Sequence, residues 1–352
     1  MEPLGIADGS VVFKIAIAVL IVLTACAGQP TTEAADQQEA SPPAGPATEE
    51  PAAAPTEPVP PLQAVATVYP LAWVLEQVAP AADVQWLAAA GQDPHDMELT
   101  PSQRAAVEQA DVVAYLGDID FQPQVETAVG DAGGVVVDAA EVLGGDALRT
   151  YDGHAHDDED DHGHSHDDEA DDHAGEEGSV DPHLWFDARL LAQLAEAAGA
   201  AFAEADPDRA DDYRANAEQT AQELDALAGQ VDALLTGCRH DEVIVSHEAY
   251  AYLLEPHDLE QHGISGAGGH SEASPRAIAE LAEEIREHGL PAVLTEPVEG
   301  RRDAEAVAAE AGVELIEIYS LDIVDEAQAA RGFPDLLREQ AEAVAEAAGC
   351  GG

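Results

Sequence analysis

Short apolar runs alternate with helical patterns along most of this chain. In the first half, the runs expected as buried strands are Gln63–Val68, Val84–Leu87, Val112–Leu116 and Val135–Ala139, and the expected helices are Leu71–Val78, Pro101–Gln109 and Gln122–Val129. After residue 240 the expected strands are Val243–Ser246, Leu259–His262, Ala292–Thr295 and Leu315–Tyr319, and the expected helices are Pro275–His288, Arg302–Ala311 and Phe333–Ala348. This alternation predicts mostly parallel sheets with helices on both faces. We therefore expect an α/β protein with two lobes, each built on its own sheet.

A purely helical pattern separates the two halves. Asp187–Ala205 is expected to be one helix, and a second should begin at Asp206, because an acid followed by proline is typical of a helix start. From there to about Thr236 the one strong breaker is Gly229, so the helix would be roughly 45 Å long if unbroken. We interpret residues 206–236 as a rigid linking helix between an N-terminal lobe, 62–205, and a C-terminal lobe, 237–352.

The N-terminus has the features of an export signal. An apolar run from Val11 to Ala25 contains only Lys14 as a charge and is too short for a confident membrane span. It ends in Leu23-Thr24-Ala25-Cys26, which has the form of a lipobox, so Cys26 is the expected lipidation site and residues 1–26 the signal peptide. Residues 27–61 are rich in Pro, Ala and Glu and cannot bury enough apolar surface to fold, which predicts a disordered tether.

Net charge and cysteine content limit the possible partners and indicate a disulfide. The formal net charge of −59 excludes nucleic acid as a plausible partner, because phosphates would be repelled. Besides Cys26, the chain holds two cysteines, Cys238 and Cys350. A pair in an exported chain indicates a disulfide, which would join the start of the C-terminal lobe to the chain's end; two unpaired thiols are the alternative.

Three histidines and one aspartate stand out as candidate metal ligands. His95 follows the second expected strand, His247 follows Val243–Ser246 directly, and Asp322 comes shortly after Leu315–Tyr319. His183 precedes the helix expected at Asp187. We expect all four in strand-to-helix loops, two from each lobe, and such loops meet at the carboxyl edges of open sheets. Three imidazoles and a carboxylate suit zinc, with neutral rings donating one nitrogen each.

A second group of histidines lies in an acidic, low-complexity loop over residues 151–180. Its histidines are His154, His156, His162, His164, His166 and His173. Closely spaced imidazoles can hold zinc without a fixed geometry, so the loop is interpreted as an accessory zinc collector, with an acidic insertion of no metal-binding role as the alternative. The remaining histidines, His240, His257, His262, His270 and His288, are expected at the surface.

The order of these segments resembles the metal-binding (cluster A-I) substrate-binding proteins of ABC importers, in particular their zinc-binding branch. The resemblance covers nearly all of residues 62 to 350. It is carried by Asp93-Pro94-His95, Asp181-Pro182-His183-Leu184-Trp185, Ser246-His247-Glu248-Ala249-Tyr250, Glu272-Ala273-Ser274-Pro275, Thr295-Glu296-Pro297 and Leu321-Asp322.

The resemblance implies capture of Zn(II) as the transported ligand in a cleft between the lobes. His95, His183 and His247 would be ligands, with Asp322 or water completing the tetrahedron. Histidine at the position of His247, where manganese binders commonly have glutamate, favours zinc, as does the histidine-rich loop. The implied partners are a membrane permease and its ATPase, and the protein would be a monomer, lipid-anchored at the outer face of the cytoplasmic membrane.

Glu248 and Glu296 are expected to support the ligands rather than bind metal, by orienting the imidazoles. Three alternatives stay open. One is a manganese or iron component of the same importer class, and another is an adhesin or zinc buffer that works without a permease. The third is a zinc hydrolase, although Ser246-His247-Glu248 lacks the second histidine of His-Glu-x-x-His and no nucleophile motif is present.

Overall fold

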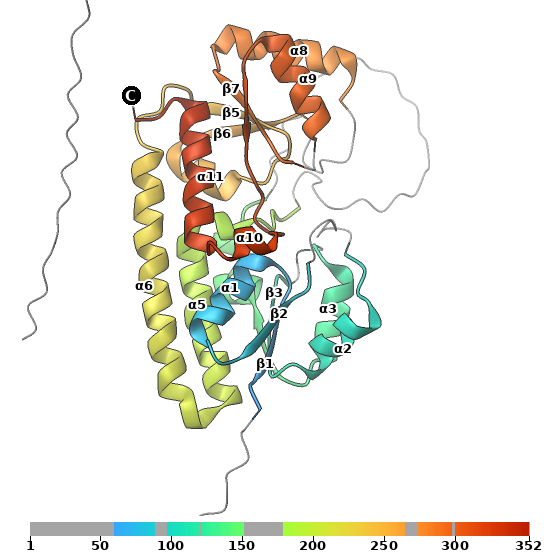
Figure 1. The fold of residues 1–352 in the computed structure, drawn as a ribbon, viewed down its shortest axis with the longest axis vertical. Coiled ribbons are helices and arrows are strands. Elements are labelled where there is room, and N and C mark those ends of the chain that lie inside the picture. Colours follow the sequence, from blue (N-terminus) through green and yellow to red (C-terminus); the bar gives the residue numbers. More distant parts are fainter. Residues whose placement is uncertain are drawn as a thin grey trace, which may run out of the picture. The chain divides into compact units, whose positions relative to one another are not determined.

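Two four-stranded parallel sheets organise the part of the chain that the computed structural model describes, residues 60–88, 97–117, 119, 121–150, 179–264, 273–297 and 300–351 (Figure 1). The first has the order β2-β1-β3-β4, with β1 Gln63–Ala66, β2 Asp83–Trp86, β3 Val112–Tyr115 and β4 Val135–Asp138. The second has the order β6-β5-β7-β8, with β5 Glu242–Val245, β6 Glu260–Gly263, β7 Ala292–Thr295 and β8 Glu314–Glu317. All eight expected strands are present, and the two-lobed α/β fold is confirmed.

Helices connect the strands and cover the sheets. The α-helices are α1 Tyr69–Val78, α2 Pro101–Gln109, α3 Pro123–Val129, α4 Ala139–Leu143, α5 Ala188–Ala205, α6 Ala210–Leu234, α7 Ala251–Leu254, α8 Pro275–His288, α9 Arg301–Ala311, α10 Glu326–Ala329 and α11 Phe333–Ala348. The 3₁₀ helices are η1 Gly145–Ala147, η2 Leu184–Phe186, η3 Pro207–Arg209 and η4 Glu255–His257. The short α4, α7 and α10 are not expected from the sequence, because four or five residues carry too little periodicity.

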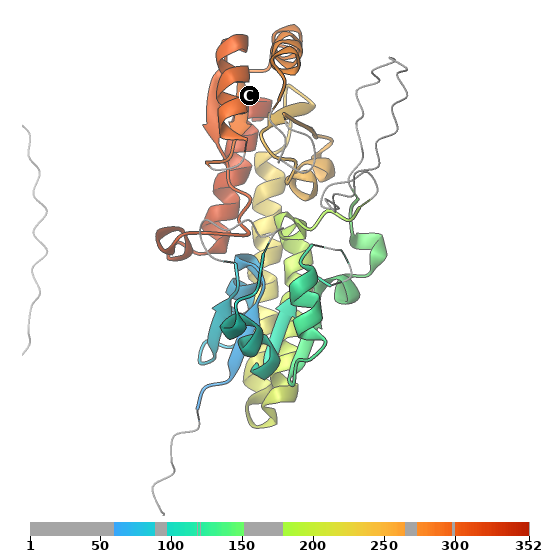
Figure 2. The same cartoon turned by 90° about the vertical axis from the view of Figure 1, so that its right-hand side faces the viewer.

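The long helix α6 begins later than the sequence predicts. Asp206 starts only the 3₁₀ turn η3, where its carboxylate accepts a 2.6 Å hydrogen bond from Arg209 Nε. Arg209 then leaves helical geometry with a φ of −113°, so α6 proper starts at Ala210 and has 25 residues, roughly 37 Å. In Figure 1 it packs against α5 and α1 along its lower part and against α11 along its upper part. It therefore links the helices of both sheets (Figure 2).

One apolar cluster reaches into both lobes. It contains Val112 of β3 and Val243 of β5, and the helices between them contribute Leu194, Leu224 and further residues of α1, α5, α6 and α11. Smaller clusters fill the opposite faces, one around α2 and α3 and one under α8 and α9. Because the shared core would have to be opened to move one lobe far from the other, this packing favours small relative motions.

A disulfide joins Cys238 to Cys350, as the sequence predicts. It connects the segment after α6 to the one after α11, and Arg239 N and His240 N both donate to Ala348 O beside it. The expected signal peptide, Cys26 and most of the tether lie outside the described residues. Within the described ranges, no helix combines the length and apolar character needed to cross a bilayer.

Candidate metal centre

His183 and His247 lie together although 64 residues separate them in sequence. Their ring centroids are 5.1 Å apart and the ring planes are inclined at 77°. His247 follows β5 after Ser246, as expected. His183 differs from the expectation of a strand-to-helix loop: it follows α4, η1 and the isolated bridge between Thr150 and Val180, and directly precedes η2. Both histidines are buried.

Asp181 orients the ring of His183. Its Oδ1 accepts from His183 N at 2.9 Å and lies 2.7 Å from His183 Nδ1. A carboxylate can only accept, so Nδ1 carries the ring proton and the lone pair of the neutral imidazole is on Nε2. Asp181 is not among the residues expected from the sequence to orient a metal ligand. The sequence contains a signal for this contact, because an aspartate side chain commonly accepts a hydrogen bond from the backbone N–H two residues later.

Glu296 orients the ring of His247 in the same way. Glu296 Oε1 lies 3.1 Å from His247 Nδ1 and accepts a 2.7 Å hydrogen bond from the Tyr250 hydroxyl. The Glu296 backbone N–H donates to Ser246 Oγ at 2.9 Å, which fixes the end of β7 against the end of β5. These bonds again place the lone pair of a neutral His247 on Nε2.

The structure places Glu248 elsewhere than expected. Its Oε1 accepts a hydrogen bond of 2.9 Å from Gly263 N, at the end of β6. A Cβ at Gly263 would lie 2.6 Å from Glu248 Cγ, so glycine is needed for this close approach. The Glu248 carboxylate therefore connects the His247 loop to the sheet edge, whereas Glu296 is the acid that contacts the His247 ring.

Asp322 is buried and tightly held. Its Oδ1 accepts from Ser320 Oγ at 2.7 Å and from Ile323 N at 2.8 Å. Burial raises the pKa of the Asp322 carboxyl above its usual value, while the nearby His183 and the Ser320 hydrogen bond act in the opposite direction. Leu321 has a φ of +66°, a strained conformation for a branched side chain.

The Asp322 loop is fixed by the other lobe. Tyr69 N, at the start of α1, donates to Asp322 O at 3.0 Å, and Trp185 Nε1 donates to Ser320 O at 2.7 Å. The Trp185 ring also meets His183 edge to face, with centroids 5.3 Å apart. Two elements of the first lobe thus support the loop that presents Asp322 from the second.

Other predicted site residues lie outside the described ranges. These are His95, the six histidines from His154 to His173, and Cys26. In the described part, two oriented imidazoles lie together, and His183 is near enough to Asp322 to influence the pKa of that buried carboxyl. Two nitrogens and an oxygen from neutral and anionic groups fit a borderline-soft divalent cation such as zinc.

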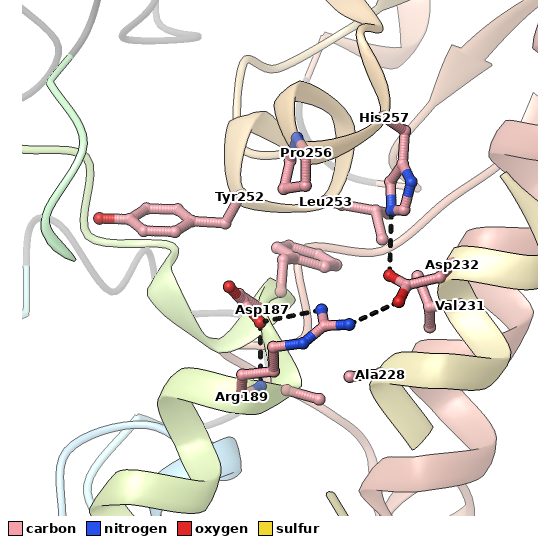
Figure 3. A pocket seen from close by; sticks show the side chains of 11 residues that line it. Asp187, Arg189, Ala228, Val231, Asp232, Tyr252, Leu253, Pro256 and His257 are labelled. Carbon is pink, nitrogen blue, oxygen red and sulfur yellow. Dashed lines mark hydrogen bonds and ion pairs between the residues drawn. The ribbon is translucent and has the colours of Figure 1, made fainter. Parts of the chain in front are cut away.

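A separate pocket lies beside this region, between the start of α5, the end of α6 and the segment α7–η4 (Figure 3). Arg189 reaches between Asp187 and Asp232, and His257 approaches Asp232 from the opposite side, with 3.7 Å between His257 Nε2 and Asp232 Oδ1. Its ionic groups are satisfied by one another. The ion pairs that line this pocket connect α5 and η4 to α6. The pocket does not contain the imidazole pair of the candidate centre.

Comparison with known proteins identifies a sequence family and proteins similar to this chain. The sequence model of the family described as "Zinc-uptake complex component A periplasmic" matches residues 64–347. The chain is 26% identical over 288 residues to the high-affinity zinc uptake system protein ZnuA of Bacillus subtilis, covering 80% of this chain and 86% of that protein. It is 25% identical over 274 residues to the manganese-binding lipoprotein MntA of Halalkalibacterium halodurans, covering 76% and 82%.

A solved structure supports the fold. The periplasmic zinc-binding protein TroA of Treponema pallidum matches with a TM-score of 0.66 and 19% identity, over 82% of this chain and 98% of that one. At this identity the likeness concerns the fold alone.

Proposed function

Because the chain belongs to the family of periplasmic zinc-uptake components, we propose that it captures Zn(II) outside the cytoplasmic membrane and delivers it to an ABC-type permease with its ATPase. The observation that carries this proposal is the pair of buried imidazoles, His183 and His247, 5.1 Å apart. Each has its Nδ1 engaged by a carboxylate, so each directs Nε2 as the metal donor.

The proposed ligand set is His183, His247 and Asp322, with His95 as the third imidazole from outside the described residues. Zn–N bonds of about 2.0–2.1 Å and a Zn–O bond of about 2.0–2.2 Å would complete a tetrahedron. Asp181 and Glu296 act by holding the rings and their tautomers. Tyr250 in turn holds Glu296, so the orientation of His247 depends on a chain of three side chains.

Zinc is favoured over manganese by the donor chemistry. Imidazole-rich sites suit zinc, whereas manganese prefers carboxylate, carbonyl and water oxygens. Since the similar proteins include both a zinc-uptake protein and a manganese-binding lipoprotein, manganese is the specific rival. The proposal extends to lipid anchoring through Cys26, to an accessory role of His154–His173 in collecting zinc, and to a monomeric state.

Competition titration against a chelator, with zinc and manganese in parallel, tests the proposal. The wild-type chain should bind one zinc tightly and manganese weakly, and His183→Ala should raise the zinc Kd at least about a hundredfold by removing a ligand. His240→Ala is the matched control, because that histidine lies beside the disulfide and outside the centre. Tight manganese binding with weak zinc binding would overturn the choice of cargo, and unchanged zinc affinity in His183→Ala would overturn the site.

A further inference from the structure

Three metal-binding side chains converge in the second lobe, apart from the candidate centre. They are Glu242, Glu284 and His288, and one ligand atom from each lies within 4.8 Å of the other two. Glu242 and Glu284 are half-buried and His288 is exposed, so an ion from solvent can reach them. None of the three belongs to the proposed zinc centre, and His288 is among the histidines expected at the surface.

The sheet register explains how Glu242 reaches this place. In the parallel pairing of β5 with β6, Ile244 lies opposite His262. Ile244 belongs to the apolar cluster under α8 and α9, and side chains two positions apart share a face of a sheet. Glu242 and His262 therefore project on the same face as Ile244, at the margin of the apolar cluster.

The C-terminal end of α8 is fixed over the same margin. Ile285 and Leu290 are both buried in the cluster, and the backbone N–H groups of Gly289 and Leu290 donate to Ile285 O. Gly289 adopts a φ of +70°, which ends the helix there. Glu284 and His288 are four residues apart and so lie on one face of α8, one turn above the other. The backbone thus presents both side chains toward Glu242 without further rearrangement.

Glu242 is held from both of its oxygens. His288 Nδ1 is hydrogen-bonded to Oε1, and His262 Nε2 lies 3.2 Å from Oε2. Glu284 adds a second carboxylate close to the first, in a chain that already carries a net charge of −59. The pKa of His288 is raised, chiefly by its hydrogen bond with Glu242 and then by the charges of Glu242 and Glu284, which reports the negative potential at this spot.

We propose that Glu242, Glu284 and His288 form an accessory site for a divalent transition-metal ion, distinct from the cargo site. One imidazole nitrogen and two carboxylate oxygens, with water in the fourth position, are a donor set that zinc accepts. His262 is a positioning residue, because its Nε2 lies 3.2 Å from Glu242 Oε2, the carboxylate oxygen that does not contact His288. An ion bound here would cross-link β5 to the end of α8.

The spacing of the three side chains is close to that of a zinc site. Ligand atoms around a tetrahedral zinc are roughly 3.3 Å apart, given bond lengths of about 2.0–2.2 Å. The present spacing, within 4.8 Å, therefore needs side-chain adjustment alone.

Zinc binding by the full chain tests this site. Equilibrium dialysis against increasing Zn(II) would compare wild type with Glu284→Gln, His288→Gln and the matched control Glu283→Gln, which removes the same charge from an exposed position of α8. Glu284→Gln and His288→Gln should each lose one zinc equivalent or raise its Kd at least about tenfold. Glu283→Gln should bind as wild type does.

The outcomes separate this proposal from the cargo site. Glu284→Gln leaves the His288–Glu242 hydrogen bond in place, so a folding defect is not expected, and a melting curve in chelator checks this. Equal zinc stoichiometry and affinity in Glu284→Gln, His288→Gln and wild type would overturn the accessory site while leaving the effect of His183→Ala intact. Loss of tight zinc binding in His183→Ala with a persisting Glu284-dependent equivalent would support both.

Discussion

The Tyr250 hydroxyl donates a 2.7 Å hydrogen bond to Glu296 Oε1, the same oxygen that lies 3.1 Å from His247 Nδ1. Tyr250 and His247 are only three residues apart, yet they meet through an acid from another strand's end. The hydroxyl therefore fixes which oxygen of Glu296 is offered to the ring. All three side chains are buried, so water does not replace a lost partner easily.

This relationship predicts that Tyr250→Phe weakens zinc binding without replacing a ligand. Removing a group that orients a metal-bound histidine typically costs 10–100-fold in affinity, so we expect a rise of roughly that size in the zinc Kd. Tyr319→Phe is the matched control, because its hydroxyl bonds Glu317 at the surface and not the centre. Competition titration of both variants gives the answer; equal affinities for Tyr250→Phe and Tyr319→Phe would contradict the role assigned to Tyr250.

Asp322→Asn should separate stability from metal binding. Burial raises the pKa of the Asp322 carboxyl. The protonated carboxyl therefore contributes fully to stability below the pKa that Asp322 has in the unfolded chain, and this contribution is lost as pH rises through its pKa in the folded chain. At neutral pH without metal, the buried negative charge opposes folding, and a neutral asparagine can still accept from Ser320 and Ile323. We expect the metal-free variant to melt at a higher temperature than wild type.

The same substitution should weaken zinc binding, at least about tenfold, because it removes an anionic donor. In wild type, zinc must displace the proton of Asp322 at acidic pH, so affinity should fall more steeply with decreasing pH than in Asp322→Asn. Calorimetry in buffers of different ionisation enthalpy measures the released protons. Asp325→Asn serves as control, since that acid caps α10 instead. Equal proton release in wild type and Asp322→Asn would argue against direct ligation by Asp322.

Much of this arrangement is predictable from the sequence, and the remainder is lost for identifiable reasons. The strands carry continuous apolar runs such as Val243–Val245, and the lone histidine after this run indicates a site at the sheet edge. The sequence does not identify the hydrogen-bond partner of that histidine. Glu296 and Glu248 are both acids near strand ends, and only the tertiary structure decides that Glu296 faces His247 while Glu248 bonds Gly263.

The backbone conformation of Leu321 is also not predictable from the sequence pattern. Leu321 has an ordinary apolar side chain, and its positive φ follows from the fixed positions of its neighbours: Ser320 O accepts from Trp185, and Asp322 O accepts from Tyr69. These contacts come from residues more than a hundred positions away. Strain imposed by such distant anchors leaves no local signature.

Leu321 provides a direct test of that strain. Its side chain is fully buried, so both Leu321→Ala and Leu321→Gly should destabilise the protein, by about 2–5 kcal/mol for the alanine. Glycine is ordinarily worse than alanine by up to about 1 kcal/mol, but it adopts positive φ freely. We therefore expect Leu321→Gly to be at least as stable as Leu321→Ala in urea unfolding. A clearly less stable glycine variant would mean that the backbone here relaxes at no cost.

His257 should make stability depend on pH through the pocket between α5, α6 and η4. Burial lowers the pKa of His257 below its usual 6.5, and the nearby Asp232 acts in the opposite direction. The unfolded chain therefore takes up a proton at higher pH than the folded chain does. The free energy of unfolding must fall as the pH drops from about 6.5 through the folded-state pKa, with a slope of at most about 1.4 kcal/mol per pH unit for one proton.

Urea unfolding at several pH values between 7.5 and 5, in the presence of a chelator, measures this slope. His257→Gln removes the titrating group and should flatten the dependence relative to wild type, whereas His240→Gln, outside the pocket, should not. A slope unchanged in His257→Gln would mean that other groups account for the acid sensitivity. A flattened slope would instead identify the burial of the His257 imidazole as the cause of the acid sensitivity, since Asp232 favours the protonated ring.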